Sequence, residues 1–277
     1  MEDHGIPQAR HRLIILGIRE DVGIEEIPLR LNRQTPVSLA SAIGDLPRIR
    51  SGLSKESDNA GAWQERITEL TGSVWYRELV GKNQALRTQV DRALQAIVKC
   101  ELTRGDDWFG SVTQPALHPL WFGDRKIKGV FNHQTRGHKH EDLHRYLYAS
   151  CYAKTLNNSP LMKDFPKELL PDHKNIGEAV AGKKFADRFR VQVADRPSTT
   201  ITSHISKDGH YYIHPDPTQC RSLTVREAAR LQTFPDNYFF CGPRTSQYTQ
   251  VGNAVPPFLA HQIAEIVHAI LSHLNRN

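Results

Sequence analysis

Two arginines and a glutamine alternate with other residues near the start of the chain, just before an apolar run. Gln8, Arg10 and Arg12 form this first cluster, and the run is Leu13 to Leu16. On an extended chain, residues two apart point to the same side. One face would then present an amide and two guanidiniums, which bind phosphate or carboxylate through paired hydrogen bonds. The cluster suits a phosphate or a base edge, although a solvated edge strand would show the same pattern.

Two further clusters lie near the other end of the chain. The second cluster combines RPSTTI at 196–201 with RSLTVREAARLQTFPD at 221–236, and the third is QVGNAVPP at 250–257. In the third, Gly252 and Asn253 form a turn before a helix that starts with proline. Such a turn places backbone N–H groups and an amide at a helix N-terminus, where small polar ligands can bind.

The three clusters together resemble the DNA cytosine-5 methyltransferase family. GIPQARHR followed by LIILG resembles the family's eighth conserved motif, RSLTVREAARLQTFPDNY the ninth and QVGNAVPPFLAHQIA the tenth, in the family's order. These matches cover both ends of the chain. The middle, roughly 22–187, corresponds by position to the family's target-recognition region.

The resemblance implies a mixed α/β (α+β) fold in four parts. Residues 1–21 would hold the eighth-motif strand, 22–195 the target-recognition region, 196–249 the ninth motif, and 250–277 the tenth motif with a C-terminal helix. The first and last parts would be a remnant of the methyltransferase parallel-sheet domain. The target-recognition part would consist of short strands and helices.

The resemblance also implies roles for individual residues. Family enzymes flip a cytosine out of the duplex, as chemistry on a base requires. Arg12 matches the arginine that contacts this base, while Gln8 and Arg10 match positions that shape the site and its phosphate surroundings. The family's S-adenosylmethionine pocket is lined at positions that match Asn253, Ala254 and Val255.

Three elements that the family's chemistry needs are missing from this sequence. The nucleophile is a cysteine after a proline, because it must react as a thiolate, and here the four cysteines follow Lys99, Ser150, Gln219 and Phe240. A Gly-rich cofactor loop after a first strand and a Glu-Asn-Val segment are also missing. All three precede the eighth motif in the family. We therefore expect an incomplete S-adenosylmethionine site and no methyl transfer by this chain alone. A split-enzyme subunit, a broken reading frame and an expression fragment all fit this pattern.

Basic residues in the middle of the chain are candidates for contacts with DNA phosphates. The net charge of +6 favours polyanionic partners. The candidates are Arg125, Lys126, Lys128, Arg136, Lys139, Arg188, Arg190 and Arg196. For the last three a solvated face is the competing interpretation. We expect double-stranded DNA and a chain carrying the N-terminal catalytic motifs as partners. The alternative is a DNA-binding module, or an inactive truncated relic, with no catalytic partner.

A group of histidines between 132 and 144 raises the question of a metal site. His140 and His144 would lie one helical turn apart, a spacing that metal sites use. No cysteine or acidic motif accompanies them, so we predict no metal site and favour a basic or structural patch. His204, His210 and His214 are expected to be surface or hydrogen-bonded residues, and the tryptophans mainly core residues.

Periodicity predicts the elements that would position these residues. Apolar spacing predicts helices over 84–99 and 141–156, and Ser38 and Gly44 bound a short one. A Thr224–Glu227 capping box starts a helix that ends near Thr233. Strands are predicted over 13–17 (buried) and 189–193, with a hairpin pairing 199–205 with 209–213.

The last predicted helix begins after Pro256 and Pro257 and carries a broad apolar stripe. Such a stripe must pack against something large, so we expect aggregation or tight association with a partner. The N-terminus does not resemble a secretory signal and the apolar runs are too short to span a bilayer. We therefore expect a cytoplasmic protein with reduced cysteines and no membrane partner. Restriction-modification or phage defence would be its setting.

Overall fold

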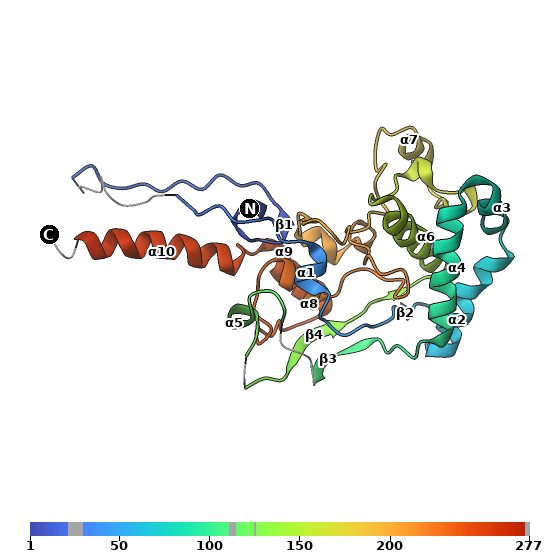
Figure 1. The fold of residues 1–277 in the computed structure, drawn as a ribbon, viewed down its shortest axis with the longest axis horizontal. Helices are drawn as coiled ribbons and strands as arrows, with labels where there is room; N and C mark the ends of the chain where they lie inside the picture. The colour runs from blue at the N-terminus through green and yellow to red at the C-terminus, as the bar shows by residue number, and fades with distance from the viewer. Residues whose placement is uncertain (22–29, 111–114, 125, 275–277) are drawn as a thin grey trace.

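The computed structural model describes residues 1–21, 30–110, 115–124 and 126–274 of the chain. It has a mixed α/β architecture, as predicted, in which helices predominate and the strands are short. A body of two adjoining hydrophobic cores lies on one side. From this body the segment before residue 22 and the last helix extend in the same direction (Figure 1).

The first core is helical and is built from the middle of the chain. Its main helices are α2 (Ala60–Thr68), α3 (Val74–Lys82), α4 (Gln84–Lys99) and α6 (His140–Leu156). Short turns η2 (Glu69–Gly72), η3 (Met162–Asp164), η4 (Lys167–Leu169) and helix α7 (Ile176–Val180) surround them. The apolar face of α4, including Val90 and Ile97, packs on α6 through Leu143 and Leu147. The helices predicted over 84–99 and 141–156 are therefore confirmed.

The second core surrounds the ninth-motif helix α8 (Val225–Leu231). Helices α1 (Leu39–Ile43), α5 (Pro119–Phe122) and α9 (Arg244–Asn253) lie around it, with turns η5 (Ser203–Ser206) and η6 (Gly209–Tyr211). Ser38 caps α1 and Gly44 ends it, while Thr224 and Glu227 form the predicted capping box of α8. Because the Thr224 hydroxyl accepts from Glu227 N–H and the carboxylate accepts from Thr224 N–H, two orphan donors are satisfied.

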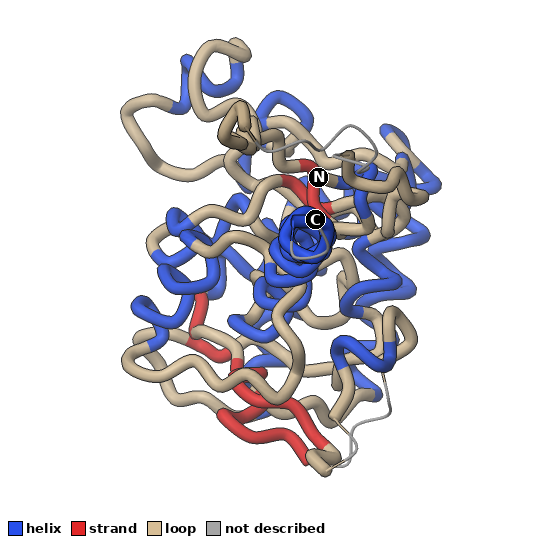
Figure 2. Tube along the Cα trace, turned by 90° about the vertical axis from the view of Figure 1, so that its left-hand side faces the viewer, coloured by secondary structure: helices blue, strands red, loops and turns tan. Residues whose placement is uncertain are grey.

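The described strands form three separate pairs rather than one sheet. β1 (Gln8–Ala9) runs parallel to β6 (Ser198–Thr199), and β2 (Gly52–Leu53) runs parallel to β5 (Gly137–His138). β3 (Gly105–Gly110) and β4 (Gly129–Gln134) are antiparallel, with Trp108 opposite Phe131. Figure 2, which looks along the last helix, shows these strands scattered among loops and helices.

Three strand predictions are wrong. Residues 13–17 form no strand, and the exposed fractions of Leu13 and Ile15 are 86% and 82%. No described neighbouring strand pairs with this segment, so its apolar side chains stay exposed. Residues 189–193 contribute a single bridge, between Val191 and Ile213. The predicted hairpin after Thr199 is replaced by turns η5 and η6.

The reason for the lost hairpin lies in its neighbours. Asp208 accepts a hydrogen bond from the His210 N–H, which closes the chain into the turn η6 instead of a two-residue hairpin loop. Turn η5 lies directly on α9, so its backbone cannot continue as a flat strand. The alternation of apolar and polar residues therefore gave a wrong prediction here, because tertiary packing decides whether such short segments form β-strands.

The last helix, α10 (Pro257–Leu274), is long, as predicted. Along its apolar stripe Leu259 and Ile270 are buried, Ile263, Ile266 and Val267 are partly buried, and Leu271 beside them is exposed. The stretch Arg244–His273, which joins α9 and α10, contains an 18-residue window that is long and apolar enough to cross a membrane by length and composition, and 17% of this window is buried. Its first turn contacts the body, where the Phe258 ring lies 5.1 Å from that of Trp121. The Gln262 side chain donates to the His4 carbonyl, so α10 runs beside the N-terminal segment (Figure 1). The covering partner that we expect for this helix stays a prediction.

Candidate functional site

Gln8 of the first cluster is fully buried against the second cluster. Its amide nitrogen donates to the carbonyl of Leu231 at 3.1 Å and to the side chain of Gln232 at 2.7 Å. Its amide oxygen accepts from the Ile201 N–H at 3.0 Å. Because all its polar atoms are used inside the protein, Gln8 fixes the position of β1 instead of contacting a ligand.

Arg10 joins the first cluster to both of the others. One terminal nitrogen lies 3.2 Å from the Ile201 carbonyl oxygen and 3.4 Å from the Gly252 carbonyl oxygen. Its Nε is buried without a hydrogen-bond partner. Partial burial and then the nearby charge of Arg12 lower the pKa of Arg10. The clusters at the two ends of the chain therefore meet at one place, as the family resemblance requires.

The remaining residues of the first and third clusters lie at the surface of this junction. The side chain of Arg12 is exposed, and it donates to the neighbouring His11 carbonyl at 2.7 Å. Asn253 and Val255 are exposed and Ala254 is partly buried. An exposed guanidinium, an amide and small apolar groups could form one wall of a ligand site. They do not enclose a ligand by themselves, because the side facing them is solvent.

Arg221, Arg226 and Arg230 of the second cluster are buried and serve the scaffold. Arg221 makes a two-pronged ion pair with Glu227, at 2.7 and 2.6 Å. Arg230 pairs with Asp236 and with Asp45. The third arginine, Arg226, donates to the main-chain carbonyls of Phe131 and Pro235. All three arginines are at most 1% exposed. The sequence did not predict these buried ion pairs. The one local signal was the capping box, which contains Glu227, the partner of Arg221.

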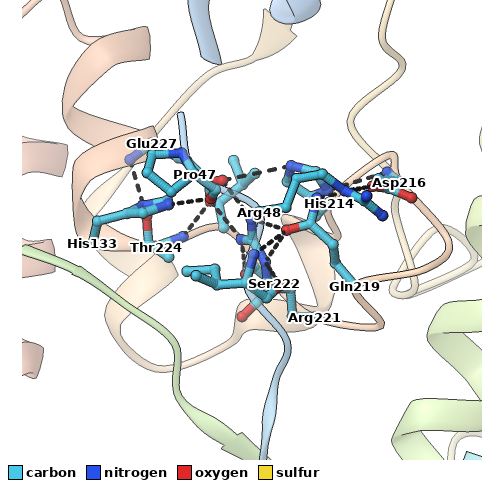
Figure 3. A network of polar contacts seen from close by, with 12 residues as sticks. Pro47, Arg48, His133, His214, Asp216, Gln219, Arg221, Ser222, Thr224 and Glu227 are labelled. Carbon is cyan, nitrogen blue, oxygen red and sulfur yellow. Dashed lines mark hydrogen bonds and ion pairs between the residues drawn. The ribbon is translucent and has the colours of Figure 1, made fainter. Parts of the chain in front are cut away.

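Two neutral histidines border the Arg221–Glu227 pair (Figure 3). The His133 ring lies between the Thr224 hydroxyl, at 3.0 Å, and the Pro47 carbonyl oxygen, at 2.8 Å. His214 accepts from the Asp216 N–H, and its Nε2 lies 3.5 Å from Glu227. Burial is the main reason why the pKa of each histidine falls to about 4. These contacts are those of hydrogen-bonded residues, as expected for His214.

Three of the predicted DNA-binding residues line one cavity at the start of α6. Arg136, Lys139 and Arg188 share this cavity of about 280 Å³ with Lys207, which the sequence analysis did not single out. We call it the α6 pocket. It also contains two carboxylates, Asp142 and Asp208, and the ring of His210. The structure therefore brings together basic residues that are far apart in the sequence.

The other predicted DNA-binding residues lie elsewhere. Lys126 and Lys128 are exposed just before β4. Arg190 pairs with Asp187 and lines a second open cavity, of about 600 Å³, with Thr199 and Tyr211. Arg196 bonds the Asn157 carbonyl. Arg125 lies outside the described residues.

Residues considered for a metal or for base stacking are also placed. Within the described ranges, no group of three His, Cys, Asp or Glu side chains is arranged to hold a metal ion. His144 bonds the Arg66 carbonyl at 2.7 Å, which ties α6 to α2. Trp63 and Trp75 are core residues as expected, Trp121 is partly buried, and Trp108 is 44% exposed.

Gly252 lets α9 approach turn η5 closely, and this approach gives a testable prediction. A Cβ at this position would lie 2.2 Å from the backbone nitrogen of Ser203 and 2.3 Å from the Thr202 carbonyl carbon. Backbone cannot move aside as a flexible side chain can. We expect Gly252→Ala to lower the free energy of unfolding by about 1–3 kcal/mol, the usual cost of overpacking, measured by urea titration.

A second glycine provides the control for this prediction. Gly81 is exposed near the end of α3, and an alanine methyl group there would have no neighbouring atom within 4 Å. Gly81→Ala should leave stability unchanged or raise it by up to about 1 kcal/mol, because alanine favours helix. Equal effects of the two substitutions would show that the α9–η5 contact does not require glycine.

Comparisons with known proteins agree with this geometry. The family model described as C-5 cytosine-specific DNA methylase matches residues 1–269. The chain is 34% identical over 273 residues to the type II methyltransferase M.Bpa9945I of Bacillus paralicheniformis, covering 98% of this chain and 49% of that protein. It is 24% identical over 285 residues to the type II methyltransferase M.DdeI of Desulfomicrobium norvegicum, covering 99% and 54%. The chain thus spans about half the length of these curated relatives.

Proposed function

The chain belongs to the C-5 cytosine-specific DNA methylase family, and on that premise we propose that it forms the DNA-recognising part of a type II DNA cytosine-5 methyltransferase. In this proposal it binds double-stranded DNA, recognises the target sequence and completes the S-adenosylmethionine-dependent methylation site. The observation that carries the proposal is the meeting of the first and third clusters through Arg10, beside the exposed Arg12 and Asn253.

The proposal assigns distinct tasks to the residues at this junction. Arg12, whose guanidinium is exposed, would contact the flipped cytosine. Asn253, Ala254 and Val255 would line one side of the S-adenosylmethionine site, and that cofactor would supply the methyl group. Gln8 and Arg10 would act as positioning residues, because their hydrogen bonds hold the strand and the third cluster in register.

The nucleophile would come from a polypeptide segment outside these 277 residues, which contain no Pro-Cys pair. Two apolar segments support a docking site for it. They are the exposed run Leu13–Leu16 and helix α10, on which Leu271 is exposed and Ile263, Ile266 and Val267 are only partly buried. They belong to the two segments that extend in the same direction from the body (Figure 1). Apolar surface of this extent favours association. We propose that it receives the segment that carries the catalytic cysteine and the Gly-rich cofactor loop.

A methyl-transfer assay tests this proposal. The purified chain, duplex DNA and radiolabelled S-adenosylmethionine should give no incorporation into DNA. Adding a polypeptide with the Pro-Cys and Gly-rich elements of a relative's N-terminal half should produce incorporation, with the methylated cytosines located by bisulfite mapping. Incorporation by the purified chain alone would contradict the assigned division of labour.

Two controls sharpen the assay. Arg12→Ala should reduce transfer by the mixture at least tenfold, whereas Arg19→Ala, which removes an exposed arginine paired with Asp21, should leave it unchanged. If the mixture fails to associate and the chain instead binds phospholipid vesicles, the α10 surface serves a membrane and the docking proposal is wrong. If the chain binds DNA but no mixture transfers methyl groups, the alternative function, a DNA-binding module without a catalytic partner, would be supported instead.

A further inference from the structure

The α6 pocket has an excess of positive charge that the protein itself does not neutralise. Of its two carboxylates, Asp142 is paired at 2.8 Å with Arg145, which lies outside the pocket. Asp208 is paired with Arg188 at 3.5 Å. Among the described residues, no ion pair is formed by the three other cations of the pocket, Arg136, Lys139 and Lys207. Three positive charges therefore line one cavity without an ion-pair partner, and the lining as a whole has four cations against two carboxylates.

The Arg136 guanidinium is held in place with a donor left over. One terminal nitrogen donates to the Ile205 carbonyl at 2.6 Å, and the group lies over the Tyr248 ring at 4.3 Å. Its Nε is buried without a hydrogen-bond partner, and the same is true of the Nε of Arg188. An unsatisfied buried donor is costly, and more so when it is charged. Because these atoms are closed off from solvent, an anion in the pocket would compensate the guanidinium charge rather than bond Nε.

The pocket also lies at the N-terminus of a long helix. Lys139 is the N-cap of the 17-residue helix α6, and its own side chain does not cap the first-turn amides. These amides and the helix dipole favour an anion at this end. Lys139 and Asp142 at the start of α6 line the cavity together with Arg136 and Lys207. An anion with several acceptor oxygens would suit this arrangement better than a single-oxygen acceptor.

The aromatic wall of the pocket adds hydrogen-bonding groups without adding charge. The Tyr146 hydroxyl lies 2.8 Å from the Nδ1 of His210 and 3.4 Å from that of His138. Burial lowers the pKa of both histidines and raises that of Tyr146. All three are therefore neutral near pH 7, and the charge of the pocket is set by its arginines, lysines and carboxylates.

We propose that the α6 pocket binds one phosphate group of the DNA backbone and thereby fixes the register of the helical core on the duplex. The inference rests on the proposed function, because it takes duplex DNA as the ligand of the chain. Phosphate contacts position a protein on DNA without reading its sequence. Lys207 and Arg136, on different segments of the chain, would hold the same phosphate.

Salt dependence of DNA binding tests the inference on the full chain. Lys207→Gln and Lys139→Gln change exposed side chains, so the fold should persist. Each should weaken binding to a duplex about five- to tenfold at low salt. Each should also reduce the slope of log Kd against log salt concentration by about one, as expected for one lost phosphate contact. Lys163→Gln, which removes an exposed lysine of η3 that is not among the residues lining the pocket, serves as the matched control and should change neither quantity.

Methylphosphonate scanning of the duplex identifies the phosphate. For the unaltered protein, neutralising one particular phosphate should weaken binding as much as Lys207→Gln does. The two changes together should cost little more than either alone. If DNA binds but the pocket variants behave like Lys163→Gln, or if the two losses add fully, the pocket inference is wrong while the proposed function stands. If the unaltered protein binds no duplex, the proposed function fails instead. Competition by millimolar inorganic phosphate with unchanged salt slopes would identify a free-phosphate site and overturn the assignment to DNA.

Discussion

Glu227→Gln should lower the free energy of unfolding by about 3–5 kcal/mol, the usual cost of removing one partner of a buried ion pair. Both carboxylate oxygens of Glu227 bind the Arg221 guanidinium, and both side chains are about 1% exposed. Glutamine keeps one acceptor and turns an amide N–H₂ toward guanidinium N–H groups. The substitution therefore leaves a buried positive charge uncompensated and sets donor against donor. Urea unfolding at pH 7.5 measures the effect.

Two comparisons separate this cause from the simple loss of a carboxylate. Glu78→Gln breaks the exposed pair between Glu78 and Lys82 in α3 and should change stability by at most about 0.5 kcal/mol. The double variant Arg221→Met/Glu227→Leu removes both buried charges. It should be more stable than Glu227→Gln alone, since an uncompensated charge costs more than the absence of the pair. A double variant that is less stable than the single one would contradict this account.

The elements that sequence periodicity predicted well are those whose stability is mostly local. Helix α4 has its apolar residues on one face and a capping Asn83, and α8 has a complete capping box. Both follow from residues close together in the sequence. The run 13–17 failed for the opposite reason, since an apolar run becomes a buried strand only when a neighbouring strand pairs with it. Within the described ranges nothing covers Leu13 and Ile15.

The candidate site was predictable in its residue types but not in its contacts. The motif resemblance identified Arg10 and Asn253, which the structure brings near one another through the Gly252 carbonyl. It could not show that the side-chain amide of Gln8 would be fully hydrogen-bonded to residues more than 190 positions away in the sequence. Nor could it show that Lys207 joins Arg136 in one pocket. Such placements depend on how the chain folds back on itself, which has no local signature in the sequence.

The His133 and His214 rings make the ninth-motif core sensitive to acid. Burial lowers the pKa of each to about 4, below the ordinary value of 6.5. Between these values the unfolded chain binds protons that the folded chain excludes. Stability is therefore complete above pH 6.5 and falls as the pH drops toward 4. Each histidine contributes up to about 1.4 kcal/mol per pH unit. Between pH 7.5 and 5 the two should together remove about 4 kcal/mol. His138 and His210, whose pKa burial also lowers, add to the total loss, which urea unfolding at closely spaced pH values measures.

Protonation of Glu227 lowers stability only at a lower pH than protonation of the histidines, so the two contributions to the free energy of unfolding can be separated. Burial alone would raise the pKa of this carboxyl, but the Arg221 charge and hydrogen bonds lower it below its ordinary value. Its contribution is present above about pH 4.5 and is lost only as the pH falls further. The loss between pH 6.5 and 5 thus belongs to the buried imidazoles. His214→Asn, which keeps an acceptor for the Asp216 N–H, should reduce the slope in this range by up to about 1.4 kcal/mol per pH unit. His204→Gln, altered at an exposed ring, should leave the slope as it is. An unchanged slope in His214→Asn would mean that protons reach this core without unfolding it.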